Sequence, residues 1–173
     1  MDSKSDTTIQ FSGLKCGSYT YSFKLEKEFF EAFENENLND GKVFFEVKLE
    51  KKEHFLMFYF NFEGTVKTVC DRCLGELDIP VSGNETLCVK FSDEEVSDDE
   101  NVVFLPTNEY KIDLAQWMYE YVMIAIPIQC VHPDDENGNP TCDPEMLKYI
   151  SEEVPEAINE DIDPRWAALN NLK

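Results

Sequence analysis

The chain is strongly acidic and rich in aromatic side chains. It has 173 residues, with 36 acidic and 15 basic side chains, a net charge of −21 and a hydrophobic content of 42%. This length predicts one domain with a core of its own, and the charge argues against unaided binding to a phosphate backbone and favours basic partners. The sequence holds neither a run of about 18 apolar residues nor the plan of a signal peptide, so we expect a cytoplasmic protein without membrane contact.

Alternating side chains in the first half of the chain predict a sheet. Between residues 42 and 50, apolar side chains alternate with charged ones, which is typical of a strand buried on one face. The return segment, residues 54–62, is apolar on both faces and is expected at the centre of the sheet. Gly64 and the turn formers of residues 82–84 are expected to interrupt the strands around them. A short helix is predicted at residues 26–33, and strands at 7–11, 18–25, 42–50, 54–62, 65–69, 77–81, 85–91 and 102–105.

The clearest helical pattern begins at Asp113 and stops before Pro127. Asp113 and Gln116 have the spacing of a capping box. Apolar side chains recur on one face, which predicts packing against the sheet. We therefore predict an α+β fold, with a mainly antiparallel, curved sheet or partial barrel and one packed amphipathic helix, and a further helical turn at residues 143–149. The apolar stripe comprises Leu114, Trp117, Met118, Tyr121, Val122 and Ala125.

Two segments are dominated by acidic residues. Residues 93–100 hold six acids in eight positions, which predicts an exposed excursion that is either a docking strip for a basic partner or a solvated loop. The end of the chain is also acidic, with Trp166 and Leu169 at the spacing of a short helix. We therefore assign a single globular domain to residues 1–150 and an acidic C-terminal tail to residues 151–173.

Four of the six cysteines suggest a metal site. Cys70 and Cys73 form a C-x-x-C turn after a predicted strand, and two thiolates at this spacing can bind one tetrahedral ion. In a reducing compartment, cysteines are more often free thiols or metal ligands than disulfides. Cys130 and Cys142, in the loop after the helix, complete a candidate site of four thiolates around a structural zinc ion. His132 competes with either late cysteine as the fourth ligand.

Other uses of these cysteines stay open. A redox dithiol is the main alternative, although such pairs usually stand at a helix N-terminus, whereas this one lies between antiparallel-type strands. The same cysteines can also be four unligated thiols, and a disulfide would require an oxidising compartment. The sequence has only two histidines, no Ser/His/Asp pattern and no glycine-rich phosphate loop, so no enzymatic activity is predicted.

The order of these motifs resembles a known family. Cys70-Asp-Arg-Cys73-Leu is followed by Ile112-Asp-Leu, an apolar helix running to Ile126-Pro127, the two late cysteines, and a closing Asp163-Pro-Arg-Trp with Leu169. Over residues 40–173 this arrangement resembles the YceD family of large ribosomal RNA subunit accumulation proteins.

The resemblance implies a non-enzymatic role in ribosome biogenesis, through accumulation of the ribosomal RNA of the large subunit. The family is often encoded beside a small basic ribosomal protein, and we hypothesise that this acidic chain holds a basic ribosomal protein or a large-subunit assembly intermediate. The alternative class is a redox or metal-handling protein that uses the C-x-x-C cysteines. A direct contact with ribosomal RNA is a third hypothesis, through a basic patch of Lys51, Lys52, Lys67 and Arg72.

Overall fold

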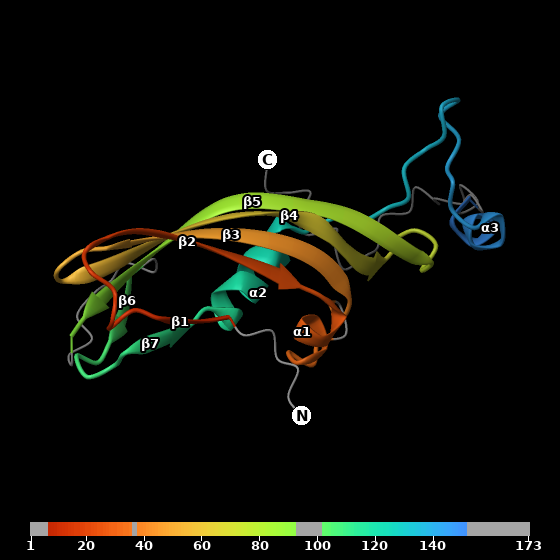
Figure 1. Ribbon diagram of the computed structural model, residues 1–173. Coiled ribbons are helices and arrows are strands. Elements are labelled where there is room, and N and C mark those ends of the chain that lie inside the picture. Colours follow the sequence, from red (N-terminus) through yellow and green to blue (C-terminus); the bar gives the residue numbers. More distant parts are fainter. Residues whose placement is uncertain (1–6, 36–37, 93–101, 152–173) are drawn as a thin grey trace, which may run out of the picture.

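The computed structural model of the chain describes residues 7–35, 38–92 and 102–151. Their main feature is one long, arched sheet of five strands in the order β2-β3-β4-β5-β6 (Figure 1). The neighbours from β2 to β5 are antiparallel, and β6 joins β5 in parallel. The strands are β2 (Gly17–Leu25), β3 (Gly41–Lys51), β4 (Phe55–Val69), β5 (Glu76–Phe91) and β6 (Val102–Leu105).

The remaining elements lie beneath the arch or beyond its end. Helix α2 (Ala115–Ala125) lies in the hollow of the sheet, as do α1 (Lys27–Glu31) and a two-stranded sheet of β1 (Thr8–Gln10) and β7 (Lys111–Asp113) (Figure 1). Helix α3 (Pro144–Ser151) lies beyond the end of the arch, and its Met146 and Leu147 are partly buried against core residues. The fold is thus α+β with a mostly antiparallel sheet, as predicted, and the described strands do not close into a barrel. None of the described helices has the length and apolarity needed to cross a bilayer.

The core lies between the inner face of the sheet and α2. Alternate residues of β3 and β4 are buried, while those on the opposite face are exposed or half-buried. Phe60 on β4 contacts Tyr121 of α2 with ring centroids 5.1 Å apart, so the predicted apolar stripe does meet the sheet. The buried side chains of the two strands are Val43, Phe45, Val47, Leu49, Leu56, Phe58, Phe60, Phe62 and Val66.

The predicted interruptions at Gly64 and residues 82–84 are wrong, because β4 and β5 each run without a break. A Cβ atom on Gly64 would collide with the carbonyl oxygen of Lys42, and one on Gly83 would stand 2.7 Å from the ring of Phe62. These glycines therefore allow a close approach within a continuous strand instead of ending it.

The start of α2 differs in part from the predicted capping box. The carboxylate of Asp113 accepts hydrogen bonds from the Ala115 N–H at 3.0 Å and from the Thr7 hydroxyl at 2.6 Å. Gln116, however, donates to Glu120 at 2.6 Å and does not reach back. The predicted turn at residues 143–149 is confirmed as α3, whereas the acidic residues 93–100 and the helix around Trp166 lie outside the described residues.

Candidate metal centre

The C-x-x-C residues occupy the tight turn that joins β4 to β5. The two strands pair as far as Val69 and Glu76, and residues 70–75 form the connection. The Cys70 N–H donates to the Gly75 carbonyl and the Leu74 N–H donates to the Cys70 carbonyl, both at 2.8 Å. Leu74 has a left-handed backbone with φ of 57°, which turns the chain back on itself.

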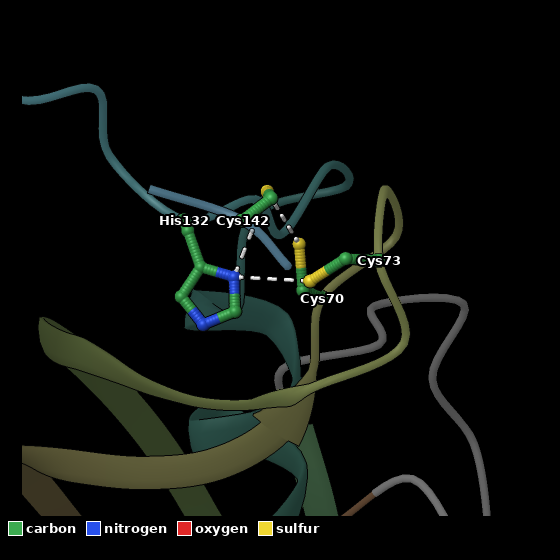
Figure 2. Close-up of side chains that lie close together, drawn as sticks. All are labelled: Cys70, Cys73, His132 and Cys142. Carbon is green, nitrogen blue, oxygen red and sulfur yellow. Dashed lines mark hydrogen bonds between the residues drawn. The ribbon is translucent and has the colours of Figure 1, made fainter. Parts of the chain in front are cut away.

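The loop after α2 docks on this turn through two hydrogen bonds between Asp71 and Cys130. The Asp71 N–H donates to the Cys130 carbonyl at 2.7 Å, and the Cys130 N–H donates to the Asp71 carboxylate at 2.6 Å. This contact fixes the loop beside the turn, so that His132 and Cys142 face the two cysteines of the turn (Figure 2).

The four facing side chains have the spacing of a tetrahedral metal site. The Sγ atoms of Cys70 and Cys142 are 3.8 Å apart, and His132 Nδ1 lies 3.4 Å from Cys73 Sγ and 3.8 Å from Cys142 Sγ. Tetrahedral ligation with metal–sulfur bonds of about 2.3 Å and metal–nitrogen bonds of about 2.0 Å puts sulfurs about 3.8 Å apart and sulfur and nitrogen about 3.5 Å apart. All four ligand atoms lie within 4.8 Å of one another, so the group fits one metal ion.

The orientation of His132 also suits metal binding. Its Nε2 lies 3.0 Å from the carbonyl oxygen of Glu76, which can only accept, so Nε2 carries the proton. In the neutral ring, Nδ1 then offers a lone pair toward the sulfurs of the turn and Cys142. A second partner that holds the ring and its tautomer in this way is usual for histidine ligands.

Backbone amides favour the thiolate forms of the two cysteines in the turn. Burial opposes ionisation of Cys70, yet hydrogen bonds from the amides of Cys73, His132 and Arg72 outweigh it and lower the pKa of its thiol to about 6. Amides of Asp143 and Gly75 likewise lower the pKa of Cys73. The anionic form that binds metals is thereby favoured at the turn.

A positively charged side chain, Arg72, lies beside Cys142 at the edge of the candidate metal centre. Arg72 Nη1 lies 4.0 Å from Cys142 Sγ and 3.7 Å from the carboxylate of Asp134. Burial raises the pKa of the Cys142 thiol. The guanidinium is thus placed to offset the negative charge that three thiolates would bring to one ion.

The structure brings together three of the four cysteines named from the sequence, with His132 as the fourth member. Cys130 stands outside the group, and its Sγ lies 3.4 Å from the Pro127 carbonyl, to which it donates. Its contribution to the centre is the backbone contact with Asp71. The roles of these residues as ligands remain predictions.

The basic residues proposed as an RNA patch do not lie at one place, because Lys51 and Lys67 stand at opposite ends of the β3–β4 pair. In the register of the sheet, Lys51 pairs with Leu56 at one end of β3, while Gly41 pairs with Val66, next to Lys67, at the other end. Ten residues along a strand span about 33 Å. Lys67 forms an ion pair with Asp40 at 3.3 Å. These residues therefore do not make one patch.

Comparison with known proteins identifies the family. A family model described as "Large ribosomal RNA subunit accumulation protein YceD" matches residues 58–173, which include the turn and the loop that form the metal centre. The chain belongs to the YceD family. No curated protein and no solved structure matches it. The YceD match begins within β4, so β1, β2 and β3 lie outside it, and the family's description connects the chain with accumulation of large-subunit ribosomal RNA.

Proposed function

We propose that this protein is a non-enzymatic assembly factor for the large ribosomal subunit in the cytoplasm. The observation that carries this proposal is the YceD match over residues 58–173. In this role the chain holds a basic ribosomal protein, or an assembly intermediate that contains one, until ribosomal RNA takes its place.

The charge of the chain supports a basic protein as the client. A net charge of −21 attracts a positively charged protein over distance and shields its surface from premature contacts. Direct capture of RNA is less well supported, because Lys51 and Lys67 lie at opposite ends of a strand pair and Lys67 is paired with Asp40.

Sedimentation of the tagged chain with ribosomal particles tests the assembly role. We expect the chain to migrate with precursors of the large subunit. If it migrates only as free protein in cells that accumulate those precursors, the assembly role is wrong. Binding to isolated basic proteins of the large subunit, compared with binding to ribosomal RNA at about 0.2 M salt, separates the two kinds of client.

We further propose that the metal centre holds one structural Zn²⁺ through Cys70, Cys73, His132 and Cys142. Four protein ligands leave no position for substrate, which is typical of structural zinc. The ion would tie the β4–β5 turn to the loop beyond α2. Mass spectrometry under native conditions should find one zinc ion per chain, lost in Cys142→Ser and retained in Cys130→Ser.

A redox role for the same cysteines is the competing function. The turn connects antiparallel strands, so Cys70 and Cys73 lack the helix N-terminus that activates most redox dithiols. A chain isolated without metal and with a reactive Cys70–Cys73 dithiol would favour the redox role.

A further inference from the structure

Strand β2 leaves one long edge of the sheet unpaired within the described part of the chain. It is hydrogen-bonded to β3 on one side, and no described strand lies on the other. The opposite edge strand, β6, has four residues, whereas β2 has nine. A row of free N–H and C=O groups of this length is a template for another strand.

The sequence of β2 lacks the proline and the repeated charges that usually protect an edge strand from such pairing. It contains no proline, and Lys24 is its only charged residue in a chain with 29% charged residues. Its inner face carries Tyr19, Tyr21 and Phe23, which are only half-buried although the corresponding face of β3 is fully buried. One additional strand would cover these three rings.

We propose that β2 binds β2 of a second copy of the chain, so that the two strands pair antiparallel and two sheets become one. A two-fold axis at Tyr21 pairs all nine residues and keeps the inner side chains on the inner face. No like charges meet in this register. The opposed residues are Tyr19 with Phe23, Thr20 with Ser22, and Ser18 with Lys24.

Local charge favours a second copy over a strand from a basic partner. At physiological ionic strength, only charges within about 8 Å act strongly across the seam. Lys24 forms an ion pair with Glu26, and Lys48 forms one with Glu50, each at 2.7 Å. With these charges neutralised, Glu46, which lies opposite Ser22 on β3, leaves little net charge at the edge. Such an edge offers a basic strand little attraction. Two copies of the chain repel each other mainly through charges far from this edge, and salt screens that repulsion.

Sedimentation equilibrium of the full chain tests this pairing. At about 0.15 M salt we expect twice the chain mass of 20.1 kDa, and at about 0.01 M salt we expect dissociation, because the unscreened charge of −21 on each copy then opposes the contact. Pairing of this edge with a strand from a basic partner would show the opposite salt dependence, because attraction between opposite charges is strongest at low salt.

Two double variants that differ only at residue 22 test the register. Thr20→Glu with Ser22→Glu places like charges opposite each other twice in the dimer, whereas Thr20→Glu with Ser22→Lys places opposite charges there. We expect the first to dimerise at least about tenfold more weakly than the second. Both side chains are exposed, so both variants should keep the fold, which circular dichroism checks.

A control adds the same charges away from the edge. Thr86 and Asn84 on β5 lie in the same cross-strand rows as Thr20 and Ser22, and both are exposed. Changing both to Glu should leave dimerisation unaltered. A chain that is monomeric at about 0.1 mM, a dimer strengthened by low salt, or equal dimerisation of the two residue-22 variants would overturn the proposal. The proposal is independent of the ribosomal role.

Discussion

The sheet and the loop of the metal centre are stabilised in different ways. The sheet buries the inner faces of β3, β4 and β5 against α2. In residues 127–143, by contrast, only Cys130 and Cys142 are buried, so the loop has almost no apolar core. Its contacts with the β4–β5 turn are polar, through the Asp71–Cys130 and His132–Glu76 hydrogen bonds and, we propose, a shared metal ion. We therefore expect the loop to need the sheet for its position, whereas most of the sheet should fold without the loop.

Loss of a metal-binding side chain should give the clearest difference in stability between the loop and the sheet. Cys142→Ser, or removal of metal by a chelator, should increase amide exchange in residues 127–143 by about tenfold or more, while β3 and the middle of β4 keep their protection. Hydrogen exchange with mass spectrometry measures both regions at once. Cys88→Ser, at a cysteine outside the centre, should change neither region, and equal loss of protection in the sheet would contradict the comparison.

Phe60→Ala should destabilise the whole molecule. Phe60 is buried and packs against Phe45, Phe58 and Tyr121, so the cavity should cost about 3–5 kcal/mol of unfolding free energy. Denaturant unfolding followed by circular dichroism measures this loss. Tyr59→Ala removes the neighbouring ring on the exposed face and should cost about 1 kcal/mol or less.

Gly64→Ala should cost about 1–3 kcal/mol, because the added methyl group collides with the backbone of β3. Gly13 provides the control, since a Cβ there meets nothing within 4 Å, and Gly13→Ala should leave the denaturation midpoint nearly unchanged. If Gly64→Ala leaves the free energy of unfolding unchanged, then β3 and β4 move apart at this point at little cost.

The smallest effect is expected at Asp71, which acts on the loop through Cys130. Asp71→Asn loses a charged hydrogen bond and should weaken metal binding by about tenfold without measurable change in the sheet. Competition with a chelator measures the affinity. Asp134→Asn, at an exposed carboxylate 3.7 Å from Arg72, should have a smaller effect, and the reverse order would reject the anchoring role of Asp71.

The sheet was predictable because alternation along a strand is a local property. The period of two in residues 42–50 and the two apolar faces of residues 54–62 place β3 and β4 correctly. The role of Gly64 is not predictable in this way, because it depends on the Lys42 carbonyl of the neighbouring strand, which the sequence does not place.

The composition of the metal centre was predictable only in part. The spacing of Cys70 and Cys73 indicates a shared ligand site by itself. The choice between Cys130 and His132 depends on how the loop docks, and the backbone of Cys130 is engaged by Asp71, a residue that no metal motif identifies.

The position of β2 relative to the family match separates two properties of the chain. The match begins at residue 58, so β2 and the pairing that we propose for it lie outside the segment that the family model covers, whereas the turn of Cys70 and Cys73 lies within it. If two copies pair through β2, that assembly does not follow from family membership and has to be measured for each chain.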